Sequence, residues 1–246
     1  MKLSILVPGI RPQNWRRLYE SINVHDHWEI IFVGPTPPPE DLKASNIKFF
    51  RSWRSPCACQ QIALHYAVGE YVTWAADDGF YMPGALTYAL GMAEYKTLVV
   101  GKYQEGDSPH PDMEKEEYYT MGYHKAYRLK GIPPKCLIFN CGVISRRFLM
   151  ELGGWDAETF EVPCMAHADL SIRAYRAGAE MILQDQLMFK CSHMPGKTGD
   201  HSPIDIAQNK HDIPNFKKLY SKPSHRMNIN PENWKNTPMR WGRRFK

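Results

Sequence analysis

The sequence predicts an α/β fold in which a mostly parallel central sheet is flanked by helices. Strand-like apolar runs alternate with segments at helical spacing through most of the chain. Many of these runs are apolar on both faces, as in strands that lie between two layers of helices. Most of them end at Gly, Pro or Asp, which stop strands. At 246 residues the chain is long enough for a full hydrophobic core without disulfide bridges.

The first half of the chain predicts the order strand, helix, strand, strand, helix, strand. The expected strands are Lys2–Gly9, Trp28–Val33, Ile47–Phe50 and Glu70–Ala76. Helices are expected over Arg11–Val24, where large apolar residues share one face, and over Pro56–Val68. Helical connections between strands favour parallel pairing.

The second half continues the alternation with less regular spacing. Further helices are expected at Ala85–Tyr95, Ser145–Leu152 and His167–Ala177, and further strands at Thr97–Gly101, Lys135–Asn140, Glu180–Leu183 and Leu187–Cys191. Glycines follow the last two helices, as is typical of helix ends. After His193 the pattern becomes irregular. We therefore expect one domain over residues 1–195 and an irregular basic extension over residues 196–246.

The extension combines positive charge with aromatic rings. From residue 222 onward, seven Lys and Arg residues stand against Glu232 alone. Trp234, Trp241 and Phe245 are interleaved with them, a pattern suited to phosphate and base contacts in nucleic acid. The composition therefore predicts an anionic partner, and a solvated basic tail fits it equally well.

The six cysteines are predicted to be reduced thiols. No CxxC pair occurs, and no segment like a signal peptide precedes the first expected strand. No apolar run reaches the length that crosses a membrane. We therefore expect a cytoplasmic protein without a transmembrane segment.

Asp77 and Asp78 form the most informative polar feature of the sequence. They follow the expected strand Glu70–Ala76, and Met82–Leu86 behind them reads as the start of a helix. Open α/β sheets bind their ligands at the carboxyl ends of their strands. Two adjacent carboxylates repel each other unless a cation or an array of donors neutralises them. The pair predicts a ligand site, and a solvated Asp-Gly turn is the alternative.

Four segments, in this order, resemble the nucleotide-sugar glycosyltransferases with the GT-A fold, similar to family 2 and usually inverting. They are the first strand and helix at Leu3–Ile22, the acid pair with the helix behind it, the turn Gly153–Asp156, and Asp169–Arg173 followed by Ala177-Gly178. Together they cover about residues 1–195. The resemblance implies a GT-A fold and the transfer of a sugar from a nucleotide-sugar donor, most often a UDP-sugar, to an acceptor hydroxyl.

The resemblance also implies a divalent cation, Mn²⁺ or Mg²⁺, which neutralises the leaving diphosphate. The last acid of the family's Asp-x-Asp motif falls on Asp77, whereas the first falls on Ala75. Either Asp78 compensates for the missing acid or the metal is held weakly. The family often has a further ligand after the last core strand, where this chain has His193. The implied metal ligands are therefore Asp77, Asp78 and His193.

An inverting transfer needs a base that takes the proton of the acceptor hydroxyl. The family's Glu-Asp-x-Asp-Leu pattern corresponds here to Ala166–Leu170, which places His167 at the base position and Asp169 at the second acid. Both are therefore implied as catalytic residues. For Asp169 a helix-start acid or a pair with Arg173 one turn later is the structural alternative.

By the same resemblance the donor lies over the ends of the first strands, at Pro8, Gly9, Arg11, Gly34, Asp77 and Asp78. Trp155 and Asp156 would line the acceptor side, while a buried, packed indole is the alternative for Trp155. Arg54 fits either a phosphate contact or a solvated loop.

We therefore predict a glycosyltransferase, hexosyl or pentosyl, whose acceptor is a glycan or a modified base in viral DNA. The alternative is a non-catalytic nucleotide-sugar or nucleic-acid binding module on the same fold, which Ala75 and the altered segment Ala166–Leu170 favour. A nucleotidyltransferase is a third reading, although the loop after the first strand lacks the usual Gly-rich basic pattern of that class.

Overall fold

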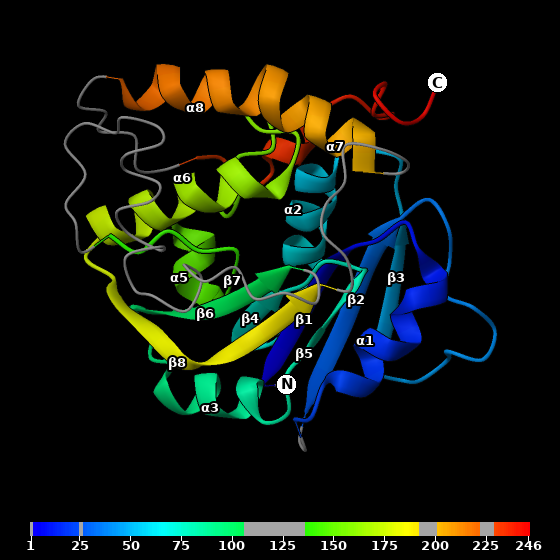
Figure 1. Cartoon of the computed structure of the whole chain (residues 1–246), viewed down its shortest axis with the longest axis vertical. Coiled ribbons are helices and arrows are strands. Elements are labelled where there is room, and N and C mark those ends of the chain that lie inside the picture. The colour runs from blue at the N-terminus through cyan, green and yellow to red at the C-terminus, as the bar shows by residue number, and fades with distance from the viewer. Residues whose placement is uncertain (1, 25–26, 106–135, 192–200, 222–228) are drawn as a thin grey trace.

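The centre of the molecule is an eight-stranded sheet with the order β3-β2-β1-β4-β7-β6-β8-β5 (Figure 1). The computed structural model describes residues 2–24, 27–105, 136–191, 201–221 and 229–246. Four neighbouring strands pair in parallel: β3 (Ile47–Arg51), β2 (Trp28–Gly34), β1 (Leu3–Pro8) and β4 (Tyr71–Trp74). Their carboxyl ends therefore meet at one edge of the sheet.

The other half of the sheet is mixed. β7 (Cys141–Ser145) runs antiparallel between β4 and β6 (Thr97–Glu105). β8 (Glu180–Cys191) is parallel to β6, and β5 (Gly79–Tyr81) pairs antiparallel with β8 at the edge. The predicted α/β fold with a central sheet between helices is confirmed.

Helices cover both faces of this sheet (Figure 1). α2 (Pro56–Tyr66), α5 (Arg146–Glu151) and α6 (Pro163–Arg176) lie on one face, and α1 (Trp15–Ser21) and α3 (Ala85–Met92) on the other. Each face has its own apolar core, with Leu6 and Ile31 in the first and Ile5 and Phe32 in the second. Because neighbouring residues of β1 and β2 point to opposite cores, both strands are apolar on both faces, apart from the buried hydrogen-bonded pair Ser4 and Glu29.

α6 begins one turn earlier than the sequence predicted. Pro163 occupies its first turn, where a missing N–H costs nothing. Gly178, at φ 84°, ends it, and the Ala179 N–H donates back to the Ala174 carbonyl at 3.0 Å. His167 and Asp169 therefore lie inside the helix, two positions apart, and cannot share a face.

Two strand predictions are wrong in detail. β7 begins at Cys141, after the predicted Lys135–Asn140, of which residues 136–140 form no strand. The two short strands predicted between residues 180 and 191 are one strand, β8, whose polar middle includes the buried Gln184. The sequence does not predict β5, because Asp77-Asp78-Gly79 is typical of a turn and Gly79 is the first residue of this strand. In the structure Gly79 packs against the Phe189 ring, and a Cβ there would lie 2.2 Å from that ring.

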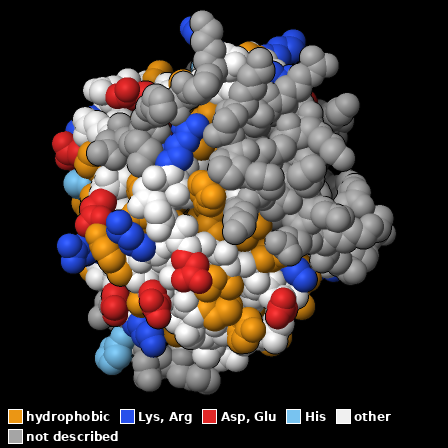
Figure 2. All heavy atoms as spheres, turned by 90° about the vertical axis from the view of Figure 1, so that its left-hand side faces the viewer, with side chains coloured by type: hydrophobic (Ala, Val, Ile, Leu, Met, Phe, Trp, Pro, Cys, Tyr) orange, Lys and Arg blue, Asp and Glu red, His pale blue; other side chains and the backbone are white. Residues whose placement is uncertain are grey.

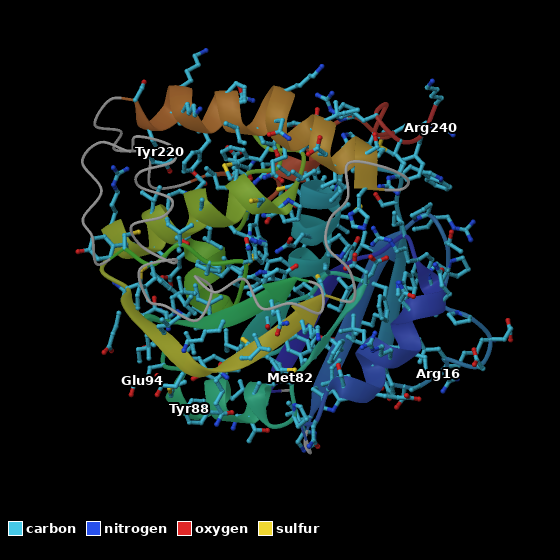
Figure 3. The ribbon with its side chains drawn as sticks, in the orientation of Figure 1. Arg16, Met82, Tyr88, Glu94, Tyr220 and Arg240 are labelled. Atoms are coloured by element: carbon cyan, nitrogen blue, oxygen red, sulfur yellow. The ribbon has the colours of Figure 1, made fainter. Side chains whose placement is uncertain are left out.

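The extension is helical where the sequence predicted an irregular segment. α7 (Ser202–Ala207), a π-helical turn (Gln208–Asp212) and α8 (Ile213–Tyr220) follow one another, and a 3₁₀ turn covers Asn233–Asn236. α8 lies across α6 and buries Phe216 and Tyr220 in the first core (Figures 1 and 3). The prolines that look like breaks in the sequence fall in the first turns of α7 and α8, where they fit.

The molecular surface carries both signs of charge. On the face drawn in Figure 2, the coloured Lys and Arg side chains are interspersed with Asp and Glu. Within the described ranges, none of the helices is both long enough and apolar enough to span a membrane.

Candidate functional site

The carboxyl ends of the parallel strands open into a cavity of about 490 Å³, a size typical of small-molecule sites. The residues that line it include every donor-site residue predicted from the sequence and one of the two predicted bases: Pro8, Gly9, Arg11, Gly34, Asp77, Asp78 and His167. These residues come from the ends of β1, β2 and β4 and from α6. The fold therefore gathers them at the sheet edge where α/β proteins bind ligands.

The floor of the cavity depends on two glycines. Gly9 follows β1, and Gly34 is the last residue of β2. A Cβ on Gly34 would lie 1.8 Å from the Gly9 carbonyl oxygen, so no larger residue fits while the two loops keep this approach. The Gly9 N–H donates to the Val33 carbonyl at 3.0 Å, which joins the loops. Their backbone thus forms one continuous surface under the cavity.

Asp77 holds the loop after β1. Its Oδ2 accepts the backbone N–H groups of Ile10 and Arg11, both at 2.6 Å, and its Oδ1 pairs with the Arg11 guanidinium. The carboxyl is almost fully buried, at 2% exposed. A carboxylate with these donors and the Trp15 indole N–H on it is satisfied without any further cation. Asp77 therefore shapes the loop and aims Arg11 across the cavity.

Asp78 lies beside the ion pair of Asp77 and Arg11 and faces His201, which the sequence does not predict as a site residue. Arg11 lies 3.5 Å and His201 Nε2 lies 3.4 Å from Asp78 Oδ2. Arg11 Nη2 is closer to His201 Nε2, at 3.0 Å, so we read His201 Nε2 as the acceptor of an arginine N–H. One arginine thus links both acids and the histidine.

The acid pair does not fit the predicted divalent cation in this arrangement. Both oxygens of Asp77 are taken by N–H donors, and the Arg11 guanidinium lies where a cation would meet the pair. Among the described residues no three His, Cys, Asp or Glu side chains converge as metal ligands. The predicted third ligand, His193, lies outside the described residues. We therefore derive no step through a metal ion.

His167 is a buried histidine at the other side of the cavity. Its ring lies between Trp74, Phe139 and Trp155, with centroid distances from 5.3 to 6.1 Å. Burial lowers its pKa from 6.5 to about 3, so the ring is neutral at neutral pH. Nε2 lies 3.1 Å from the Gln60 side-chain nitrogen, whereas the buried Nδ1 has no hydrogen-bond partner among the described residues. Nδ1 is therefore the polar atom of this ring that the described residues leave unsatisfied.

The lowered pKa of His167 predicts a pH-dependent stability. Below pH 6.5 the unfolded chain protonates this histidine while the folded state does not, so stability is full above pH 6.5 and falls as the pH drops towards 3. Between pH 7 and pH 5 the free energy of unfolding should fall by about 2 kcal/mol through this residue. Urea unfolding of His167→Gln at both pH values should show a correspondingly smaller loss. His65→Gln, at an exposed histidine, should keep the wild-type pH dependence, and an equal slope in all three proteins would contradict the assignment.

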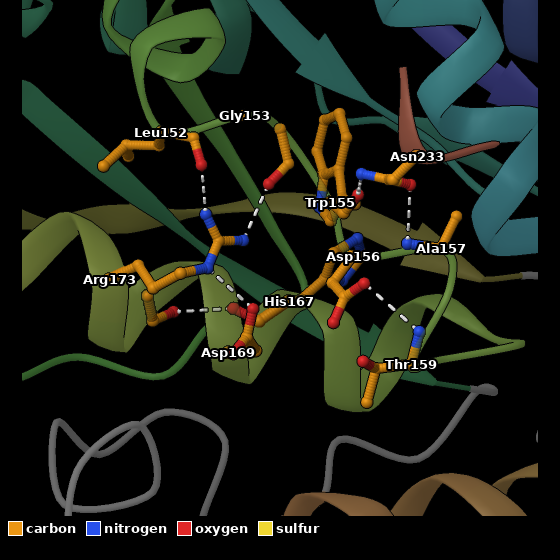
Figure 4. A network of polar contacts seen from close by, with 12 residues as sticks. Leu152, Gly153, Trp155, Asp156, Ala157, Thr159, His167, Asp169, Arg173 and Asn233 are labelled. Atoms are coloured by element: carbon orange, nitrogen blue, oxygen red, sulfur yellow. Dashed lines mark hydrogen bonds and ion pairs between the residues drawn. The ribbon is translucent and has the colours of Figure 1, made fainter. Parts of the chain in front are cut away.

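Asp169 lies in a buried network behind the cavity (Figure 4). Arg173 Nε donates to its Oδ2 at 2.7 Å, and the Tyr220 hydroxyl donates to its Oδ1 at 2.6 Å. The Arg173 guanidinium also donates to the carbonyls of Leu152 and Gly154, both at 2.7 Å. Asp169 is fully buried and does not line the cavity. The geometry therefore favours a positioning role for Asp169 over the predicted role of base.

Trp155 and Asp156 also lie behind the cavity wall and do not line it. Trp155 is fully buried, and its ring meets His167 and packs edge-on against Trp74. Asp156 Oδ1 accepts the Thr159 N–H at 3.2 Å (Figure 4). The two residues therefore support the cavity wall from behind, whereas the sequence predicts that they line the acceptor side of the site.

Several residues of the cavity were not identified from the sequence. Gln60 comes from α2 and His201 precedes α7, while Trp241, Arg244 and Phe245 come from the carboxyl-terminal end. Local patterns did not mark them, because they reach the cavity only through the packing of distant segments. The sequence pattern of the extension predicts that Trp241 and Phe245 contact nucleic acid, whereas in the structure both line the cavity.

Comparison with known proteins shows the fold. No family model matches the chain, and no curated protein sequence matches it. Among solved structures, S. aureus TarS superposes with a TM-score of 0.54 at 14% identity, over 83% of this chain and 39% of TarS. TarS 1–349 in complex with UDP gives 0.54 at 14% identity, over 79% of this chain and 61% of that one. The same fragment with UDP-GlcNAc gives 0.51 at 15%, over 82% and 60%.

This chain therefore corresponds to between 39% and 61% of the length of these TarS chains. TarS is a glycosyltransferase of the GT-A type. At this level of identity the likeness concerns the backbone arrangement. The chain has a GT-A fold.

Proposed function

We propose that this protein transfers a sugar from a nucleotide-sugar donor, with a UDP-sugar as the first candidate, to an acceptor hydroxyl. The observation that carries the proposal is the cavity itself, in which a fixed arginine, an acid pair and a neutral histidine converge at the carboxyl edge of the sheet. The likeness of fold to TarS, which has been solved with UDP and with UDP-GlcNAc, supports it.

In this proposal the loop after β1 receives the diphosphate. Arg11 is held by Asp77 and Asp78, so its guanidinium is already oriented when the donor enters. A preoriented cation stabilises the negative charge that grows on the leaving diphosphate as the bond from the sugar carbon to the phosphate oxygen breaks. Arg11 would therefore act in the transition state as well as in binding.

His167 is the proposed base, acting through Nδ1. The acceptor oxygen bonds to the sugar carbon on the face opposite the departing diphosphate, and its proton passes to His167. This role needs the tautomer with the proton on Nε2, and for this the Gln60 amide has to turn so that its oxygen, in place of its nitrogen, faces Nε2. Because burial makes the ring a weak base, proton transfer accompanies formation of the new bond.

The proposed acceptor is a compound with a free hydroxyl group, either a glycan or a modified base in DNA. The alternative of a non-catalytic module predicts binding without turnover. Release of free sugar from the bound donor, with water as the acceptor, distinguishes the two. Turnover that disappears in His167→Gln would exclude the module.

The proposal is tested by thermal unfolding with UDP, GDP, CDP and dTDP, each in Mn²⁺ and in EDTA. At about a hundred times its Kd, a ligand of the folded state should raise the melting temperature by roughly 5–10 °C. We expect this for at least one nucleotide in both buffers, because EDTA does not remove Arg11. Arg11→Met should lose the shift, whereas Arg16→Met, at a surface arginine that pairs with Glu20 and Asp41, should keep it. No shift with any nucleotide in either buffer would overturn the proposal.

A further inference from the structure

Three residues of the carboxyl-terminal segment, residues 237–246, line the cavity. Trp241, Arg244 and Phe245 line the same space as Gly34 and Pro35, which lie at the end of β2. The segment therefore faces the loops of the parallel strands, although it is distant from them in sequence. Figure 3 shows its exposed side, where Arg240 points away from the body of the protein.

Buried polar contacts fix this segment at both ends of the cavity wall. Arg54, which follows β3, donates to the carbonyl of Thr237 and to its hydroxyl, the latter at 2.9 Å. The Trp241 N–H donates to the Trp53 carbonyl at 2.7 Å. Arg54 is 8% exposed, so the sequence alternative of a solvated loop residue is wrong for it.

Glu161, just before α6, holds the segment from the other side. It accepts the Trp241 Nε1–H at 3.0 Å and forms an ion pair with Arg243. The Trp241 ring is 5% exposed and packs with Val162 and Ala207, and the half-buried Phe245 packs against the same cluster. Trp241, Arg243 and Phe245 are thus part of the fold, and Trp241 is too buried to stack on a nucleic acid strand.

The two ends of the cavity present different side chains. Near the ends of β2 and β3 it presents Val33, Pro35 and the rings of Trp241 and Phe245, together with the basic side chains of Arg54 and Arg244. Near the end of β4, two strands from β2, it presents Arg11 and the acid pair. A nucleoside diphosphate has a flat apolar base at one end and a diphosphate at the other. The rings of the carboxyl-terminal segment offer the base an apolar surface when the diphosphate lies at Arg11.

We propose that the Phe245 ring forms the base-binding wall of the donor cavity, in contact with the nucleobase, and that Trp241 holds this ring in place. This inference rests on the proposed function and adds to the donor site a residue that recognises the base and lies outside the sheet. Stacking of a base on an aromatic ring is worth about 1–3 kcal/mol, which corresponds to roughly a 5- to 150-fold change in Kd.

The test is calorimetric titration of the full-length protein with the nucleoside diphosphate that gives the largest shift in melting temperature. Phe245→Ala should weaken binding at least 5-fold, and Phe245→Leu, which keeps apolar packing but no ring, should also weaken it. Arg240→Ala, an exposed neighbour in the same segment, should bind within twofold of the wild type. Melting temperatures without ligand should establish that all four proteins are folded.

The outcomes separate this inference from the proposed function. If the wild type binds no nucleoside diphosphate, both fail. If the wild type binds and a folded Phe245→Ala binds equally well, only the base-binding wall is overturned. The same holds if Arg240→Ala weakens nucleotide binding as much as Phe245→Ala does, because the effect would then come from charge and not from the ring.

Discussion

Replacing Arg173 with methionine should lower the free energy of unfolding by about 3–5 kcal/mol. The guanidinium is fully buried and donates to Asp169 and to the carbonyls of Leu152 and Gly154. Methionine fills part of the volume but leaves a buried carboxylate with only the Tyr220 hydroxyl, and two carbonyls without their donor. Urea unfolding monitored by circular dichroism measures the difference.

The matched control for this prediction is Arg147→Met. Arg147 also pairs with an acid four residues along its helix, Glu151, but its side chain is 77% exposed. Its loss should cost less than about 1 kcal/mol. The double variant Arg173→Met/Asp169→Leu should recover part of the stability, because no unpaired charge remains buried. Equal losses for Arg173→Met and Arg147→Met would show that the network does not anchor α6.

Replacing His167 with glutamine should lower the rate of donor hydrolysis by about 10²- to 10⁴-fold, the usual contribution of a general base. Glutamine keeps a polar group near Gln60 but cannot accept and hold a proton. The Kd of the nucleoside diphosphate should change by less than about threefold, since the diphosphate is held by the loop after β1. The two quantities are measured by release of free sugar and by calorimetric titration.

This prediction compares a buried histidine of the cavity with an exposed histidine of another helix. His65→Gln, at an exposed histidine on α2, is the control and should hydrolyse donor at the wild-type rate. If His167→Gln retains the wild-type rate with an unchanged melting temperature, the base lies elsewhere and the proposed mechanism is wrong. If instead nucleotide affinity falls as steeply as the rate, His167 contributes to binding and not to proton transfer.

The sequence was informative where function depends on the end of a strand. The acid pair after β4 and the glycines at the ends of β1 and β2 were predicted as ligand residues, and the structure gathers them in one cavity. Such residues carry local signals, because turn chemistry and strand ends are visible within a few positions.

The helix α6 shows what a motif cannot specify. His167 and Asp169 come from one short pattern, yet two helical positions differ by about 200° in direction. His167 lines the cavity, whereas Asp169 points away from it into the network with Arg173 and Tyr220. The packing of α6 against α2 and α8 places His167 beside Gln60 and Asp169 beside Tyr220.

The carboxyl-terminal wall was unpredictable for a similar reason. His201 and Phe245 have no local pattern that ties them to Arg11 or Gly34, and they meet in the cavity only after α7 and the last segment have packed. The basic composition of the extension suggested an external anionic partner. In the structure Arg243 instead pairs with Glu161 of the same chain.

A crystal structure of the complex with the best-binding nucleoside diphosphate would show where the base and the diphosphate lie in the cavity. We expect the diphosphate within hydrogen-bonding distance of Arg11 and the base between Pro35 and Phe245. The cavity would then run along the sheet edge from base to reaction centre, with His167 beyond the diphosphate. A nucleotide bound outside this cavity, or with its base at Asp77 and Asp78, would contradict the account.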